Sequence, residues 1–308
     1  MAGAEAGMTA VLGRGFGHGK LILIGEHAVV YDQPALAAGI SVGISAEAVA
    51  GDGALVVPRW SLAARADDGT AVGRGLHAIL RCLRIRDLDF RVDAALPSRA
   101  GLGSSAAMAV AIARAAAEAR GLGAADVAAA VAESEAVFHG TPSGIDAAAA
   151  SLGGVGRFRR ADGWQPVPVL QAMTICVGLT GRPRDTVAEV AKVGRLRERT
   201  PAAGKVLALI GELCPAAEHA LAVGDVDSLG RLFDLAHGLL AALRVSSPEI
   251  ETLVHGARAA GAIGAKLTGA GGGGAVIALA PGHERDVLAR WKRDGFEGFL
   301  TEIAGTRA

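Results

Sequence analysis

The chain has 308 residues, 51% of them hydrophobic, and its 31 basic and 31 acidic side chains leave no formal net charge. This length and apolar fraction predict a globular protein of one large or two ordinary domains. The balanced charge disfavours nucleic acid or an anionic membrane as the main partner. Three cysteines without CxxC spacing suit a reducing compartment, and the first ten residues lack the pattern of a signal peptide. We therefore expect a cytoplasmic protein.

The first elements are two predicted strands, at 11–17 and 21–24. The second is a short apolar run bounded by glycines, which is typical of a buried strand. Lys20, Glu26 and His27 lie at the two ends of this run. Loop charges are usually solvated, but three ionisable groups around one buried strand favour a functional site.

The next part of the chain alternates between strands and helices. Residues 40–49 alternate as an antiparallel strand would, and 51–70 reads as a loop or hairpin. Apolar positions at helical spacing predict a surface helix over 73–83, and a strand is expected over 89–95.

The segment 96–107, Leu-Pro-Ser-Arg-Ala-Gly-Leu-Gly-Ser-Ser-Ala-Ala, carries the strongest local signal. Gly101 and Gly103 let backbone amides approach a bulky anion, and the helix that follows directs its unpaired N–H groups to the same place. Ser104 and Ser105 add hydroxyls that can cap the helix or bind phosphate or a metal. The pattern lacks the Gly-Lys-Ser/Thr of a Walker A loop and the third glycine of a Rossmann fingerprint. A phosphate cradle and a serine-capped turn both remain open.

Two predicted helices precede a second glycine-rich loop. The first covers about 106–120, and the second covers 126–137 and carries Glu135 near its end. The loop 139–146, His-Gly-Thr-Pro-Ser-Gly-Ile-Asp, then ends in Asp146. A turn with an aspartate side-chain bond and a catalytic loop both fit this segment.

The second half begins with strands over 165–179, and we place a domain boundary between 168 and 169. The pattern from 186 to 243 is helical, with predicted interruptions at Pro201, Pro215 and Gly224. Ser246-Ser247-Pro248-Glu249 is a helix start, with proline at the first helical position.

A glycine run follows, in Lys-Leu-Thr-Gly-Ala-Gly-Gly-Gly-Gly at 266–274, and leads directly into the apolar strand 275–279. A flexible linker seldom joins a buried strand so closely. The run therefore indicates a place where the backbone must approach another group.

Taken together, three segments resemble the three motifs of the GHMP kinases, and the resemblance extends from Gly19 to Leu279. The segments are Gly-Lys…Gly-Glu-His-Ala-Val-Val-Tyr at 19–31, Pro-Ser-Arg-Ala-Gly-Leu-Gly-Ser-Ser at 97–105 and the glycine run at 266–274. Within the family, 25–31 and 139–146 are most similar to the mevalonate-kinase branch. Asp32, Ala147 and Ala275 depart from the residues common in relatives, which are glycine, asparagine and cysteine.

The resemblance implies an α+β fold in two lobes. It implies a ribosomal protein S5 domain 2-like N-terminal domain at 1–168 and a ferredoxin-like C-terminal domain at 169–308. It also implies transfer of the γ-phosphoryl group of ATP, and in the mevalonate-kinase branch the acceptor is the 5-hydroxyl of (R)-mevalonate.

The same resemblance assigns roles to individual residues. Asp146 matches the catalytic base and Lys20 the lysine beside it, whose charge would favour ionised aspartate and stabilise the phosphoryl group. Ser105 and Glu135 match the Mg²⁺ ligands. The ATP-binding residues are Pro97, Ala100, Gly101, Leu102, Gly103, Ser104, Ser105, Ala106 and Ala107. The acceptor-binding candidates are Lys20, Glu26, His27, Thr180, Gly272 and Gly273.

Other readings within this fold remain open. The acceptor could be phosphomevalonate or a sugar, although a second phosphate would call for more Arg or Lys near Asp146. The related decarboxylases have a different first motif. A ligand sensor without catalysis is disfavoured because Lys20, Ser105, Glu135 and Asp146 are all present. ATP and a small acceptor are the expected partners, with a homodimer possible and no nucleic acid or membrane.

Overall fold

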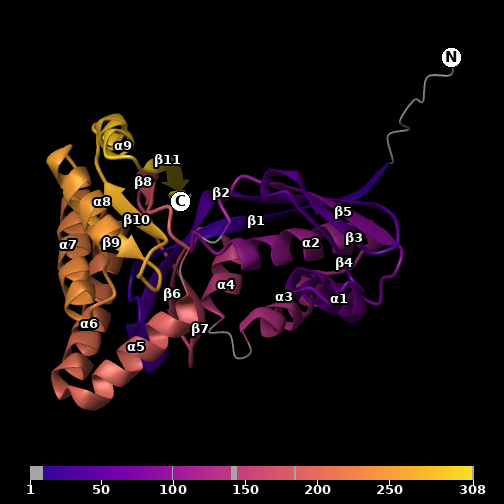
Figure 1. The fold of residues 1–308 in the computed structure, drawn as a ribbon, viewed down its shortest axis with the longest axis horizontal. Helices are drawn as coiled ribbons and strands as arrows, with labels where there is room; N and C mark the ends of the chain where they lie inside the picture. Colours follow the sequence, from indigo (N-terminus) through magenta and orange to yellow (C-terminus); the bar gives the residue numbers. More distant parts are fainter. Residues whose placement is uncertain (1–9, 99, 140–143, 184, 307–308) are drawn as a thin grey trace. The chain divides into compact units, whose positions relative to one another are not determined.

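The computed structural model describes residues 10–98, 100–139, 144–183 and 185–306, and these form two compact units that interleave along the chain (Figure 1). Unit 1 comprises Met1–Gly17, Gly43–Ala95 and Ser105–Pro142, and unit 2 comprises His18–Val42, Leu96–Ser104 and Ser143–Ala308. Strands β1 (Val11–Ile24) and β2 (Ala35–Ala50) each give one part to each unit. The expected domain boundary between 168 and 169 stays a prediction.

Unit 1 combines a sheet with three helices. β3 (Ala54–Val57) pairs antiparallel with β4 (Leu62–Arg65) and parallel with β5 (Leu88–Ala94), which pairs in turn with Ile44–Ala50 of β2. The short helix η2 (Pro58–Trp60) joins β3 to β4. The segment 51–70 is therefore a hairpin, which was one of the two structures predicted for it. The helices are α1 (Ala71–Leu83), α2 (Ser104–Arg120) and α3 (Ala124–His139), and α1 contacts α3.

The alanine-rich helix α2 lies backbone to backbone against the first half of β1. Gly13, Gly15 and Gly17 alternate along the strand, and a Cβ atom at any of them would come within 2.3 Å of a carbonyl oxygen of α2. The small residues on both sides therefore set the distance between strand and helix. This contact orients the start of α2, where the glycine loop 101–103 ends.

Unit 2 contains an antiparallel sheet in the order β11-β8-β10-β9. Its strands are β8 (Met173–Leu179), β9 (Gly264–Thr268), β10 (Ala275–Leu279) and β11 (Glu297–Ile303). In the same unit Ala35–Ala38 of β2 pairs with β6 (Val155–Arg159), and β6 pairs with β7 (Gly163–Val167).

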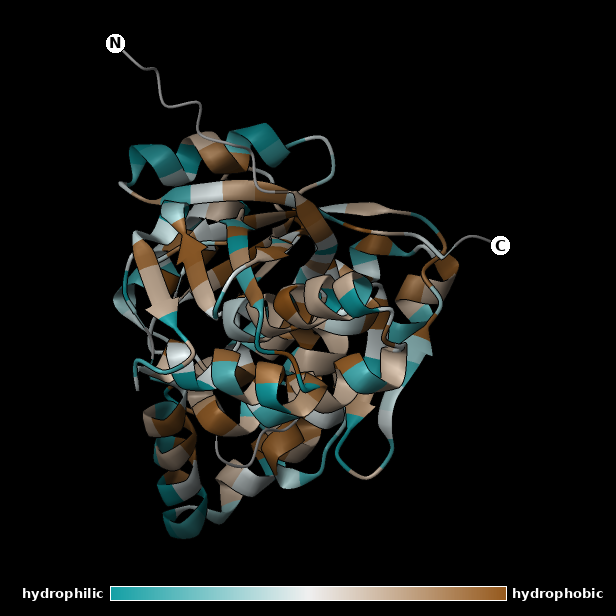
Figure 2. Cartoon of the chain, turned by 90° about the vertical axis from the view of Figure 1, so that its right-hand side faces the viewer, coloured by the Kyte–Doolittle hydropathy of each residue, from teal (hydrophilic) through white to brown (hydrophobic). Residues whose placement is uncertain are grey.

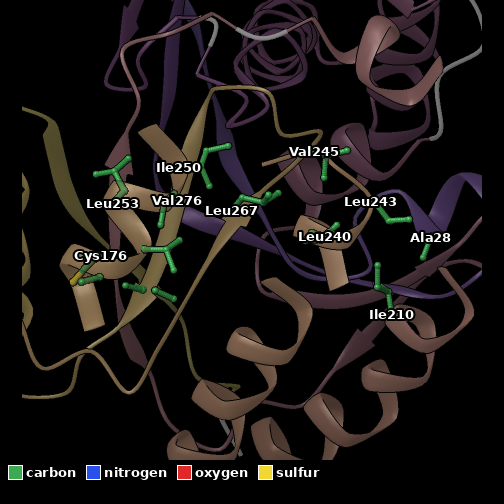
Figure 3. Close-up of a cluster of buried hydrophobic side chains, with 14 of the residues drawn as sticks. Ala28, Cys176, Ile210, Leu240, Leu243, Val245, Ile250, Leu253, Leu267 and Val276 are labelled. Carbon is green, nitrogen blue, oxygen red and sulfur yellow. The ribbon is translucent and has the colours of Figure 1, made fainter. Parts of the chain in front are cut away.

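Helices pack on the four-stranded sheet and enclose the main core of unit 2 (Figure 3). The helices that contact the sheet are α7 (Val226–Ala242), α8 (Pro248–Ala259) and α9 (Glu284–Arg293). Helix α6 (Pro201–Val223) packs on α7, α5 (Thr186–Arg199) packs on α6, and both give residues to the same core. Ile210 of α6, Leu240 of α7 and Leu253 of α8 meet Leu267 and Val276 of the sheet in this core. Many helices carry bands of hydrophilic and hydrophobic residues, as expected when one face is buried (Figure 2).

Two details differ from the sequence-based predictions. The strands 11–17 and 21–24 are one continuous strand, β1, because its glycines accommodate α2 without a break. Pro215 lies inside α6 and does not interrupt it. Proline removes only the N–H donor to the carbonyl of Gly211, and packing of α6 on α5, α7 and η1 (Ala28–Tyr31) compensates.

Helix α6 is also the one helix within the described residues that is long and apolar enough, by length and composition alone, to cross a membrane. Its residues Ala203, Leu207 and Ile210 belong to the core of unit 2. Its apolar character is thus used, at least in part, for packing within the protein.

Candidate active site

An ion pair between Lys20 and Asp146 lies at the centre of the candidate site. Lys20 Nζ is 2.8 Å from Asp146 Oδ1, and the side chains are 3% and 30% exposed. Lys20 is on β1, and Asp146 is in the first turn of α4 (Ile145–Leu152), where the sequence predicted only a loop. The helix begins after Gly144, whose φ of +89° favours glycine. The lysine is therefore buried while its carboxylate partner stays accessible.

The glycine loop lies directly against Lys20. The Lys20 backbone N–H donates a 2.8 Å hydrogen bond to the carbonyl of Leu102. Gly103 has a φ of +74°, and a Cβ there would lie 3.2 Å from the Lys20 Cβ atom. The loop therefore depends on glycine for both its conformation and its contact with the lysine.

Helix α2 begins at Ser104, immediately after the loop, so its first N–H groups have no helical partners and carry the positive end of the helix dipole. The Ser105 Oγ atom is buried and has no hydrogen-bond partner within the described residues. Glu135, on α3 of the same unit, is 3% exposed. A hydroxyl and a carboxylate are the hard oxygen donors that suit Mg²⁺. The described residues contain no cluster of three or more His, Cys, Asp or Glu side chains that would form a protein-only metal site.

A cavity of about 450 Å³ adjoins the glycine loop within unit 2. Pro97 and Ala100 line it from the loop, Thr180 and Arg182 from the segment after β8, and Gly274 from the end of the glycine run. The predicted nucleotide loop and the predicted acceptor residue Thr180 thus border one cavity.

Two of the predicted acceptor-binding side chains bond to the third motif. The Thr180 hydroxyl donates to the Gly274 carbonyl at 2.9 Å, and His27 Nε2 lies 2.8 Å from the Ala270 carbonyl, to which a protonated Nε2 donates. Both residues are about 95% buried. They join the segments that follow β1 and β8 to the glycine run.

Glu26 has a different environment from the one expected for a substrate contact. Its carboxylate pairs with Lys266, and both side chains are fully buried. Lys266 Nζ also donates to the Leu267 carbonyl at 2.7 Å. Burial raises the pKa of Glu26 and lowers that of Lys266, and in each case the charge of the partner opposes the shift.

Lys266 is the first residue of the third motif, but the sequence predicted no role for it. A lysine in a run of buried residues is the signal that could have identified it, because a buried lysine needs a partner. The identity of the partner, 240 residues away, has no local signal.

The glycine run turns tightly over the connection between α7 and α8. The Gly272 N–H donates to the Val245 carbonyl at 2.7 Å, and a Cβ on Gly271 would lie 2.1 Å from the same oxygen. Gly272 and Gly273 both have positive φ values, at +70° and +156°. Only glycines allow this approach.

The predicted site residues divide between the two units. Unit 2 contains the following: Lys20, Glu26, His27, Pro97, Ala100, Gly101, Leu102, Gly103, Ser104, Asp146, Thr180, Gly272 and Gly273. Unit 1 contains Ser105, Ala106, Ala107 and Glu135. Residues 140–143 of the second glycine-rich loop lie outside the described residues.

Comparison with known proteins identifies two matching family profiles. Residues 71–154 match the GHMP kinase N-terminal domain and residues 217–297 the GHMP kinase C-terminal domain. The mevalonate kinase of Aeropyrum pernix is 37% identical over 284 residues, which cover 85% of this chain and 86% of that protein. The mevalonate kinase of Pyrococcus horikoshii is 34% identical over 316 residues, covering 92% and 93%.

A solved structure shows the same similarity. The crystal structure of L. major mevalonate kinase in complex with R-mevalonate matches with a TM-score of 0.83 and 30% sequence identity, covering 98% of this chain and all of that one. The similarity therefore extends over both units and the full length of the predicted motifs.

Proposed function

The chain belongs to the GHMP kinases, a family of small-molecule kinases, and we propose that it transfers the γ-phosphoryl group of ATP to the 5-hydroxyl of (R)-mevalonate. The observation that carries this proposal is the Lys20–Asp146 pair beside the glycine loop. The mevalonate kinases similar to this chain over most of its length support the choice of acceptor.

In the proposed reaction the 5-oxygen of mevalonate forms a bond to the γ-phosphorus, and the bond from that phosphorus to the bridging oxygen of ADP breaks. The hydroxyl proton passes to the exposed carboxylate of Asp146. Lys20 holds this carboxylate in place through the 2.8 Å ion pair and stabilises the charge on the transferring group. Catalysis by this arrangement consists mainly of positioning and charge stabilisation.

The ATP phosphates would bind the N–H groups at the start of α2 and in the loop 101–104. Ser105 and Glu135 would hold Mg²⁺, for which the buried, unpartnered Ser105 hydroxyl is the structural support. The metal would neutralise charge on the phosphates when bound. ATP is the expected co-substrate throughout the family.

The acceptor would contact Lys20, His27 and Thr180, next to the cavity that borders the glycine loop. Glu26 and the glycines Gly272 and Gly273 would act on this pocket by shaping it, because the Glu26 carboxylate is already paired with Lys266. The cytoplasmic location and a possible homodimer remain predictions.

A coupled ADP-release assay at saturating Mg-ATP tests the proposal, with mevalonate, phosphomevalonate, galactose and homoserine as acceptors. We expect a clear preference for mevalonate and a product phosphorylated on its 5-oxygen. Preference for another acceptor would preserve the mechanism and refute the substrate. ATP binding without turnover of any acceptor would favour the sensor.

A further inference from the structure

Thr268, the last residue of β9, bonds to the backbone of β1 through its side chain. The Thr268 Oγ1 atom accepts a hydrogen bond from the Ile22 N–H at 2.9 Å and donates one to the Ile22 carbonyl at 3.1 Å. The threonine is 2% exposed, so solvent has little access to these bonds. One hydroxyl therefore bonds to both polar groups of a single backbone residue.

The hydroxyl takes the place that a neighbouring strand would have beside β1. Strand β9 is at the end of the sheet β11-β8-β10-β9, and β1 pairs instead with β2. Buried backbone N–H and C=O groups need partners, and here the partner is a side chain of β9. Lys266 Nζ is a further donor to the Ile22 carbonyl, at 3.4 Å. Side chains, and not a ladder of backbone bonds, thus fix the position of β1 along β9.

The segment of β1 that Thr268 holds also carries Lys20. Lys20 is two positions before Ile22, and N–H directions alternate along a strand, so both N–H groups point to the same edge of β1. The Lys20 N–H donates there to the Leu102 carbonyl of the glycine loop, at 2.8 Å. The glycine loop and Thr268 therefore hold one edge of β1 at points two residues apart.

Thr268 is itself held in a defined place. Its backbone pairs with Ala275 in the antiparallel contact between β9 and β10. Threonine is branched at Cβ, so few rotamers are open to its side chain. The next residue, Gly269, has a φ of +87° and begins the turns of the glycine run. Thr268 is thus the last residue at which the regular strand β9 can hold β1.

We propose that Thr268 is a positioning residue for phosphoryl transfer, and that its hydroxyl sets the reach of Lys20 toward Asp146. This inference rests on the proposed function. A shift of β1 along β9 would move the Lys20 backbone, and with it the Nζ atom that lies 2.8 Å from Asp146 Oδ1. A misplacement of about 1 Å can cost a factor of about 10² in rate. Thr268 acts through β1 and is therefore not a catalytic residue.

Two substitutions separate the hydroxyl of Thr268 from the shape of its side chain. Thr268→Val keeps the branched shape without the hydroxyl, so kcat for ADP release should fall about 10- to 100-fold while KM for ATP changes less than about threefold. Thr268→Ser keeps the hydroxyl and should stay within about threefold of the wild-type kcat. Thr301→Val is the matched control, because Thr301 of β11 is also 2% exposed but bonds to Ser41 Oγ, at 3.2 Å. It should leave kcat unchanged.

A double-mutant cycle tests whether Thr268 acts through Lys20. In a Lys20→Met background, Thr268→Val should lower kcat by less than about twofold, because the group that it positions is already absent. A general loss of structure would instead lower kcat by the same factor in both backgrounds. Equal factors, or a wild-type kcat in Thr268→Val alone, would refute the positioning role.

The nitrogen resonance of the Lys20 ammonium group provides a readout that needs no turnover. Lys20→Met identifies this signal in spectra of the full chain grown with isotope-labelled lysine. Thr268→Val should move the signal toward its position in Asp146→Asn, and Thr301→Val should leave it in place. An unmoved signal in Thr268→Val would contradict the proposal even if mevalonate were the wrong acceptor. The acceptor preference of the wild type decides the proposed substrate separately.

Discussion

Unit 2 contains two lysine–carboxylate pairs that share their chemistry but differ in their access to solvent. In the Lys20–Asp146 pair the carboxylate side chain is 30% exposed, whereas in the Lys266–Glu26 pair both side chains are completely buried. Lys266 also donates to backbone carbonyls, which leaves it fully engaged. The exposed pair can exchange a proton with a ligand, and the buried pair cannot do so without opening the fold.

This difference separates two roles that a motif alone does not distinguish. Lys20 and Glu26 are six residues apart in the same motif. The Lys20 side chain reaches the accessible carboxylate of Asp146, whereas the Glu26 side chain joins the segment after β1 to β9 through Lys266. A buried ion pair is weak evidence for stability, but removal of one partner leaves an uncompensated charge. Mutation of the Lys20–Asp146 pair should therefore mainly reduce activity, and mutation of the Lys266–Glu26 pair should mainly reduce stability.

The largest effect is expected at the exposed pair. Asp146→Asn keeps the shape of the side chain but removes the proton acceptor, so kcat should fall by about 10²- to 10⁴-fold. The ADP-release assay with mevalonate measures this loss. The thermal unfolding midpoint should fall because the buried Lys20 loses its counter-charge, but less than in Glu26→Gln, since solvent reaches the site of the 30% exposed Asp146 side chain. Near-normal turnover of Asp146→Asn would remove the basis for calling this pair catalytic.

The buried pair should produce the largest stability effect. Glu26→Gln leaves Lys266 buried without a counter-charge, and we expect a loss of about 3–5 kcal/mol in the free energy of unfolding. Urea unfolding followed by circular dichroism measures the loss. A Glu26→Gln/Lys266→Met double variant is the control, and it should recover much of the stability because no buried charge remains. A Glu26→Gln variant as stable as the wild type would show that the pair does not support the fold.

The sequence allowed the exposed pair to be predicted better than the buried one. Lys20 and Asp146 lie in recognisable motifs, and these motifs alone were enough to predict that both residues belong to one site. The contact of Glu26 with Lys266 depends on how β1 and β9 meet, which no local pattern encodes. The Gly272–Val245 hydrogen bond and the position of Pro215 within α6 are likewise products of tertiary packing. The start of α8 was predicted correctly because a local hydrogen bond from the Ile250 N–H to the Ser247 side chain decides it.

A smaller effect on activity is expected at Ser105, where mutation should change the magnesium requirement without a loss of stability. Ser105→Ala removes a buried hydroxyl that has no described partner, so the free energy of unfolding should be unchanged or slightly increased. The Mg²⁺ concentration for half-maximal activity should rise by about tenfold if the hydroxyl binds the metal. A magnesium titration of the ADP-release rate measures this shift, and Ser104→Ala is the neighbouring control. An unchanged magnesium requirement would exclude Ser105 as a metal ligand.

The smallest effect concerns His237, which contacts the residue next to Lys266. Its Nδ1 accepts a 3.4 Å hydrogen bond from the N–H of Leu267, the residue after Lys266, and its Nε2 faces Glu251. Burial lowers the pKa of His237 from its ordinary value of 6.5, while the charge of Glu251 opposes this shift and those of Arg258 and Lys266 add to it. The unfolded chain therefore binds a proton that the folded chain resists.

Stability from neutral His237 should consequently be fully present above pH 6.5 and be lost as the pH falls from 6.5 toward the lowered folded-state pKa. The slope contributed by this one group reaches at most about 1.4 kcal/mol per pH unit. His237→Gln, which keeps a hydrogen-bonding side chain but cannot titrate, should flatten this part of the profile when urea unfolding is followed between pH 7 and about pH 5. Parallel profiles for the wild type and His237→Gln would mean that His237 is already solvated. The region around the buried pair would then be more open than its contacts with β9 imply.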